Sequence, residues 1–167
     1  MSISMYRLTV PMFQRGIASM KTYLDKAEAY AEEKKIDPAI LINARLAPDM
    51  LPLSGQYQRA SDSAKFALAR LTATEAPKFE DNETTIADLR ERMAKTEAYL
   101  ASFSAEALDG SDLREITVPG RNGSVVPGIE YVALFALPNF YFHVTTAHAI
   151  LRNQGAPVGK RDFLGNF

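Results

Sequence analysis

The sequence predicts an all-α protein, a four-helix bundle with one small β-hairpin inserted before the last helix. Four long segments carry apolar residues at helical steps of three and four. The connections between them are irregular, and only one short stretch alternates as a strand does. A chain of 167 residues suits one compact domain with a substantial core, so we expect a single domain over 1–167.

The first long helix is expected over 6–31, where apolar residues share one face. Pro11 and Gly16 interrupt this pattern and predict a kink, or a late helix start near Pro11. A short helix over 38–43 should follow, with Asp37 as its cap and a proline in the first helical position.

Two further long helices are expected in the middle of the chain. Helical spacing resumes over 53–71, where small residues allow close approach of a neighbouring helix. The next helix has its core face over 86–103, and Asp81 or Asn82 is expected to cap it. One more turn over 104–109 should end at the glycine that follows.

The hairpin is predicted from two β-prone stretches, 114–118 and 124–126. Between them stands Asn122-Gly123, the residue pair most typical of a tight hairpin turn.

The last helix is expected over 129–153, and it should be the most buried element because it is apolar on nearly all sides. Pro138 should kink it, since proline cannot donate a hydrogen bond to the carbonyl of Leu134. The tail, 156–167, is expected to be extended and packed down by Phe163-Leu164.

Composition excludes several functional classes. The net charge of −1, without a basic patch, argues against nucleic-acid binding. The absence of cysteine excludes disulfides and thiolate chemistry. No signal peptide is evident and the longest apolar stretch is too short for a membrane, so a cytoplasmic protein with no membrane partner is expected.

The candidate site is a polar stripe on the last helix. Asn139, His143 and Thr146 follow helical steps, with apolar residues at both ends of the stripe. A buried polar group without a partner costs about 1–3 kcal/mol, so these side chains should face partners, water or a ligand. One interpretation is a ligand pocket inside the bundle. The other is a structural histidine satisfied by local hydrogen bonds.

The second histidine, His148, lies five residues after His143. At ~100° per residue the two side chains point about 140° apart, so they should not bind one metal ion. We expect His148 to be a peripheral or interface residue.

Two further residues are candidates for the pocket. Asp62 lies beside the apolar face of its helix with Gln58 and Lys65, either on a solvated face or paired with His143. The second alternative would make a general base, or two metal ligands. Arg45 could bind a carboxylate or phosphate, or form a salt bridge to Asp49.

Several motifs together resemble an uncharacterised bacterial family, a domain of unknown function within the DinB/YfiT-like superfamily. The resemblance covers essentially the whole chain. The motifs are Asn43-Ala-Arg-Leu-Ala-Pro-Asp49, Ala60-Ser-Asp-Ser-Ala-Lys65, Lys78-Phe-Glu-Asp-Asn-Glu83, Asn139-Phe-Tyr-Phe-His143 and Gly159-Lys-Arg-Asp-Phe163.

The resemblance implies a four-helix bundle that often forms a homodimer. Metal-binding members of the superfamily typically use three histidines, one on the second helix and a His-x-x-x-His pair on the last. In this chain Asn139 holds the position four residues before His143, residue 147 is Ala, and the second helix offers only Asp62.

The functional prediction is therefore a small-molecule-binding bundle whose pocket contains Asp62, Asn139, His143, Arg45 and Thr146. No cofactor or metal is predicted. An alternative is a metal-dependent hydrolase or transferase that holds Zn²⁺ or Ni²⁺ through His143 and Asp62. A further alternative is a dimeric structural or stress-associated protein.

Overall fold

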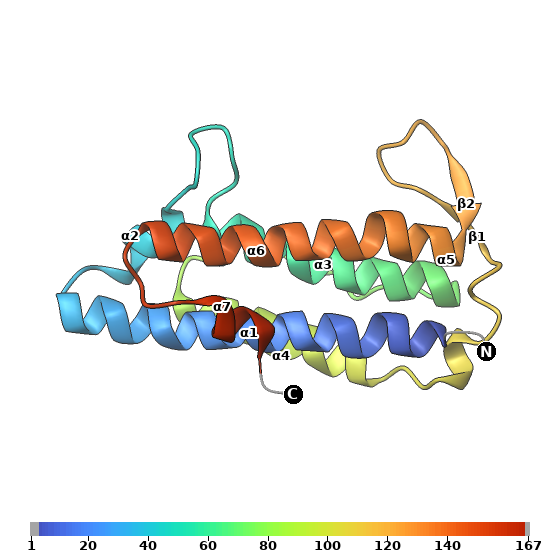
Figure 1. The fold of residues 1–167 in the computed structure, drawn as a ribbon, viewed down its shortest axis with the longest axis horizontal. Helices are drawn as coiled ribbons and strands as arrows, with labels where there is room; N and C mark the ends of the chain where they lie inside the picture. The colour runs from blue at the N-terminus through green and yellow to red at the C-terminus, as the bar shows by residue number, and fades with distance from the viewer. Residues whose placement is uncertain (1–3, 166–167) are drawn as a thin grey trace.

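Four long helices form the body of the protein in a computed structural model, which describes residues 4–165 (Figure 1). α1 packs against α4 and α6, and α3 packs against the same two helices. Shorter elements join them. The long helices are α1 (Met5–Lys34), α3 (Leu53–Thr72), α4 (Ile86–Ala101) and α6 (Leu137–Asn153). The short elements are α2 (Pro38–Asn43), η1 (Glu106–Leu108), β1 (Glu115–Thr117), β2 (Val125–Pro127), α5 (Gly128–Tyr131), η2 (Val132–Ala136) and α7 (Lys160–Leu164).

The helices run up, down, down and up. α1 and α4 are antiparallel, because Lys21 pairs with Glu97 whereas Glu28, further along α1, pairs with the earlier Arg90. α1 and α6 run in the same direction, as Figure 1 also shows.

The pair α3 and α6 is antiparallel and forms the wall on which the site is built. Residues early in α3 contact residues late in the last helical segment, and residues late in α3 contact residues early in it. The three hydrogen-bonded pairs are Arg70 with Tyr131, Ser63 with Asn139, and Gln56 with His143.

The helix starts differ from the sequence prediction at two places. α1 begins at Met5 and continues through Pro11, so a late start at the proline is wrong. Arg7, whose carbonyl the proline cannot serve, is exposed, and water can satisfy that carbonyl. α4 is capped by Thr85, not by Asp81 or Asn82, because the Thr85 side chain and Asp88 form a reciprocal capping box.

The hairpin lies where it was predicted. β1 and β2 pair antiparallel, and Ile116 stands opposite Val126. Asn122 and Gly123 both have positive φ angles, which is the conformation that their residue types favour in a tight turn. β2 ends at Pro127, and α5 begins at the next residue.

The last helix is continuous but irregular. Between α5 and α6, η2 is a π-helical turn in which the Leu137 N–H bonds to the Val132 carbonyl five residues earlier. Pro138 follows at once, in the first turn of α6. A π-turn beside a proline re-pairs carbonyls that the missing N–H leaves free.

The last helix is not the most buried element, in contrast to the prediction. Leu134 is 74% exposed and Phe142 is 55% exposed, whereas α1 buries Phe13, Ile17 and Met20 completely. The apolar residues on one side of this helix pack in the core, and those on the other side form an exposed apolar surface.

The tail is not extended throughout, because it ends in the short helix α7. Asp162 accepts a hydrogen bond from the Gly159 N–H and pairs with Lys26 of α1 at 2.7 Å. Phe163 packs against the core, as expected, but Leu164 is 38% exposed, so its predicted packing is wrong. Residues 166–167 of the predicted tail lie outside the described residues. Within residues 4–165, no helix is long and apolar enough to cross a membrane.

Candidate functional site

The candidate site is a cavity of about 240 Å³ between α3 and the segment from α5 to α6, here called the α3–α6 cavity. The loop of the hairpin closes one side of it through Pro119. Five lining residues come from one face of α3, and five from the opposite wall. They are Arg59, Asp62, Ser63, Phe66 and Arg70, and Tyr131, Phe135, Ala136, Asn139 and His143.

His143 is oriented by a chain of hydrogen bonds. The Gln56 side-chain amide donates from Nε2 to the Leu51 carbonyl at 3.0 Å, which leaves Oε1 as its acceptor. His143 Nδ1 lies 2.8 Å from this oxygen and must donate to it. The proton of the neutral ring is therefore on Nδ1, and Nε2 is left as a hydrogen-bond acceptor.

The environment keeps His143 neutral. Burial and, to a smaller extent, the positive charge of Arg59 together lower the pKa of His143 to about 4. At neutral pH the ring therefore offers an unprotonated nitrogen to the cavity.

Asn139 is fixed in the same way. Ser63 donates its hydroxyl to the Arg59 carbonyl at 2.6 Å, so its oxygen accepts from Asn139 Nδ2 at 2.6 Å. The amide oxygen of Asn139 is then a second acceptor on the α6 wall of the cavity.

Asp62 lines the cavity but does not pair with His143, so that predicted pair is wrong. Its carboxylate contacts three cations: Arg92 at 3.1 Å, Lys65 at 3.1 Å and Arg59 at 3.4 Å. Arg92 and Lys65 do not line the cavity, so they neutralise the charge of Asp62 from behind its wall.

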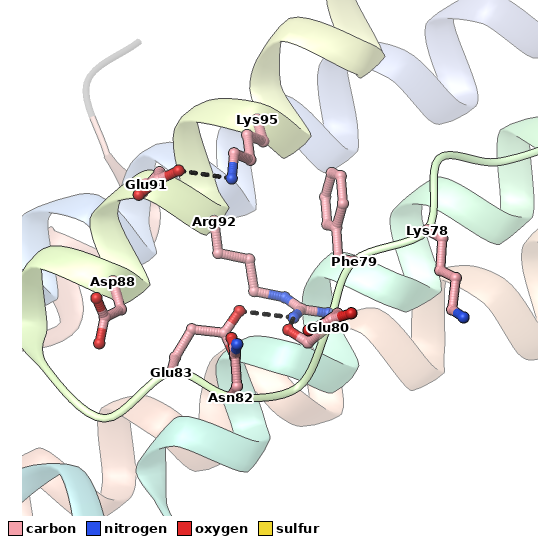
Figure 2. A pocket seen from close by; sticks show the side chains of 9 residues that line it. All are labelled: Lys78, Phe79, Glu80, Asn82, Glu83, Asp88, Glu91, Arg92 and Lys95. Atoms are coloured by element: carbon pink, nitrogen blue, oxygen red, sulfur yellow. Dashed lines mark hydrogen bonds and ion pairs between the residues drawn. The ribbon is translucent and has the colours of Figure 1, made fainter.

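Arg92 is the centre of a buried ion cluster. Its side chain is only 2% exposed and also reaches Glu83 at 2.7 Å and Asp81 at 3.1 Å. Figure 2 shows it extending from α4 toward the segment 78–83, with Glu83 facing it. It thereby joins α4, α3 and this segment.

Lys65 is buried beside it, against the prediction that this side of α3 is a solvated face. Its side chain is 1% exposed. The ammonium donates to the Pro77 carbonyl at 2.9 Å and lies 3.9 Å from the centre of the Phe79 ring. Lys65 therefore ties the start of the same segment to α3.

A larger hollow of about 460 Å³ lies on the other side of this segment, facing α4 (Figure 2). Its lining is almost entirely charged, and several charges satisfy one another. Glu91 pairs with Lys95, Glu83 pairs with Arg92, and Asp88 caps α4. These pairs make it a mixed-charge surface, and it offers less than the α3–α6 cavity to a specific ligand.

Two predicted pocket residues lie elsewhere. Arg45 donates to the Met50 carbonyl within its own loop. Thr146 donates to the Phe142 carbonyl at 2.7 Å and lines a different, apolar hollow on the outer side of α6. Neither lines the α3–α6 cavity.

His148 faces away from His143, as the helical spacing predicts. Its ring lies edge-on to Tyr23 of α1, with ring centres 5.5 Å apart. Its Nε2 and the Tyr23 hydroxyl are both buried without a hydrogen-bond partner among the residues described.

The residues present do not fit the three-histidine metal site of the superfamily. Asp62 is engaged by three cations, and Arg59 adds positive charge beside His143. Over residues 4–165 there is no group of three or more His, Cys, Asp or Glu side chains that could hold a metal ion.

Sequence reasoning missed the cationic residues of the site. Arg59, Phe66 and Arg70 follow steps of seven and four, so their common face was detectable from the sequence. Nothing in the sequence indicated that Gln56 would orient His143, because that contact depends on the register of two helices.

Comparisons with known proteins agree with this architecture. The model of the family described as Domain of unknown function (DUF1993) matches residues 5–164. A crystal structure of a DinB family member protein from Shewanella denitrificans is 44% identical, with a TM-score of 0.93, and the match covers 97% of this chain and 92% of that one. No curated protein matches the chain.

The buried ion cluster generates a stability prediction. Arg92→Leu removes the buried cation that Asp62 and Glu83 share and should lower the free energy of unfolding by about 3 kcal/mol or more. The matched control is Arg90→Leu on the same helix, where the pairs with Asp25 and Glu28 are exposed and worth under about 1 kcal/mol. Urea unfolding measures both, and equal losses would contradict the assigned role of Arg92.

His143 generates a pH prediction. Its folded pKa lies near 4, below the ordinary value of about 6.5, so the unfolded chain binds this proton first as pH falls. The stability of the wild type relative to His143→Gln should therefore decrease from about pH 6.5 to pH 4. Urea unfolding across this range measures the difference. A relative stability that stays constant, or an NMR titration of His143 near pH 6.5, would contradict it.

Proposed function

Because the chain belongs to the family described as Domain of unknown function (DUF1993), we propose a role from its site: it is a small-molecule-binding helical bundle, and the α3–α6 cavity holds the ligand. The observation that carries the proposal is that hydrogen bonds fix the orientation of polar side chains in that cavity. His143 and Asn139 are each fixed by hydrogen bonds behind them and present acceptors toward it. Oriented polar groups on an otherwise apolar wall are typical of ligand sites.

The size and lining of the cavity limit the ligand. About 240 Å³ is below the usual range for drug-sized molecules, so the ligand is a small metabolite-like compound. Phe66, Phe135 and Pro119 supply an apolar surface for its body. Arg59, Asp62 and Ser63 already bond to protein groups. The groups left for the ligand are the acceptors of Asn139 and His143 on the α6 wall and the guanidinium of Arg70 at one end.

The binding proposal predicts which residues will contact small-molecule fragments, when both charged and neutral fragments are tested. In ¹H–¹⁵N NMR titrations, shift changes should centre on Ser63, Asn139 and His143. Ser63→Phe places a ring in the cavity and should abolish these changes, whereas Ser102→Phe, on the exposed end of α4, should not. Fragments that bind only around the mixed-charge hollow, near Lys95, would contradict the proposal.

We also propose that two copies of the chain associate through the outer face of α6. Residues 132–149 contain no Asp, Glu, Lys or Arg, although Leu134 and Phe142 are exposed. Depletion of charge together with exposed aromatic residues is characteristic of the centre of a protein interface. This observation favours the alternative of a dimeric structural role, which is compatible with ligand binding.

The shape of this face suits a second copy. The loop 44–52 and the hairpin project on the same side of the molecule at opposite ends of α6 (Figure 1). A two-fold axis across α6 would bring the loop of each copy toward the hairpin of the other. Leu46 and Leu51 of this loop are 43% and 44% exposed, which extends the apolar surface.

The dimer proposal predicts a mass in solution twice that of the 18.4 kDa chain. Phe142→Glu should convert the dimer to a monomer, because it places a charge at the centre of the interface. Leu113→Glu is the matched control, since Leu113 is 77% exposed on the segment before β1. Light scattering after gel filtration measures the mass. A monomeric wild type, or a Phe142→Glu dimer, would contradict the proposal.

A further inference from the structure

Arg70 lies at one end of the α3–α6 cavity and has no counter-ion among the residues that the structure describes. It donates one hydrogen bond, from Nη1 to the Tyr131 hydroxyl at 3.1 Å. Its guanidinium lies 5.5 Å from the centre of the Phe66 ring and 6.0 Å from that of Tyr131. Among residues 4–165 it forms no ion pair, in contrast to Arg59 and Arg92. The aromatic rings hold it in place while its remaining N–H groups stay available.

Tyr131 adds a second donor at the same place. Its oxygen accepts the N–H of Arg70, so its own O–H can point to a further acceptor. Burial raises the pKa of Tyr131, which keeps the hydroxyl protonated at neutral pH. A planar guanidinium beside a phenol is well matched to the two oxygens of a carboxylate.

The charge of the cavity favours an anion. Asp62 is the acidic residue in its lining, and Arg92 and Lys65 neutralise it from behind. The positive charge of Arg70 is therefore not cancelled within the cavity, and an anion bound there would be only partly screened by solvent.

Resting on the proposed function, we infer that the ligand carries a carboxylate, which Arg70 and Tyr131 hold. The acceptor on the α6 wall nearer to Arg70 is the Asn139 amide oxygen, which lies at the level of Ser63, so the ligand carries a hydroxyl or another donor there. His143, held at the level of Gln56, lies about one helical turn further away. The rise of α3 between Ser63 and Arg70 is about 10 Å, which leaves room for a body about one aromatic ring long.

The test uses three matched probes in isothermal titration calorimetry with the full chain. 4-Hydroxybenzoate has the carboxylate and the donor, 4-hydroxybenzamide has the donor but no charge, and benzoate has the charge but no donor. The wild type should bind 4-hydroxybenzoate about ten-fold or more tightly than the amide, because a hydrogen bond to a charged group is lost with the amide. Benzoate should bind with intermediate affinity.

Variants locate the anion. Arg70→Gln should weaken 4-hydroxybenzoate about ten-fold or more and leave the amide unchanged. Arg70→Lys retains the charge without the planar fork and should give an intermediate loss. Arg152→Gln, an exposed arginine at the end of α6, is the matched control and should change nothing. If Arg70→Gln does not fold, the comparison of the acid with the amide in the wild type still tests whether the cavity recognises a carboxylate.

The outcomes separate this inference from the proposed function. Equal binding of the acid and the amide, or of 4-hydroxybenzoate to wild type and folded Arg70→Gln, overturns the carboxylate assignment and leaves the cavity as a binding site. Binding of inorganic phosphate without binding of either benzoate also overturns it. Absence of every fragment from the cavity overturns the proposed function itself.

Discussion

The site depends on the buried pairing of Asp62 with Arg92. Each ion in a buried pair loses several kcal/mol of hydration, so such a pair persists only where the remaining hydrogen-bonding capacity is largely used. Here the two Nη groups of Arg92 also bond to Glu83, Asp81 and the Glu80 carbonyl, which joins α3, α4 and the long connection between them. Its Nε is buried without a partner among residues 4–165. The connection is mostly polar and offers few apolar contacts. Ion pairs therefore hold it against the bundle.

This pairing also sets the electrostatics of the α3–α6 cavity. A free carboxylate at Asp62 would attract a proton to His143 and cancel the charge of Arg70. With Asp62 neutralised by Arg92 and Lys65, His143 experiences burial and the charge of Arg59, and its pKa falls. The same contacts that fix the fold therefore give the cavity a neutral imidazole and an uncompensated cation.

The sequence predicted the helices well because periodicity reports which face of each helix is apolar. It placed Asp62, Asn139 and His143 on faces that do line one cavity. It failed where the answer depends on contacts between helices: the partner of Asp62 is Arg92 of α4, and no local pattern gives that register. Periodicity also cannot distinguish an apolar face that packs against the core from one that is exposed. The prediction that the last helix is the most buried element was therefore wrong.

The π-turn gives a physical reason why one wall of the cavity is continuous. Tyr131, Phe135, Asn139 and His143 stand four residues apart, and all of them line the cavity. In a regular α-helix each such step advances about 40° beyond a full turn, so the outer two residues would diverge by about 120°. A π-turn has more residues per turn, and η2 lies within this stretch and counteracts the drift. Pro138 favours the irregularity, because it already lacks the N–H that a regular helix needs. The proline that interrupts the helix thus helps to align Tyr131 at the carboxylate end with His143 at the acceptor end.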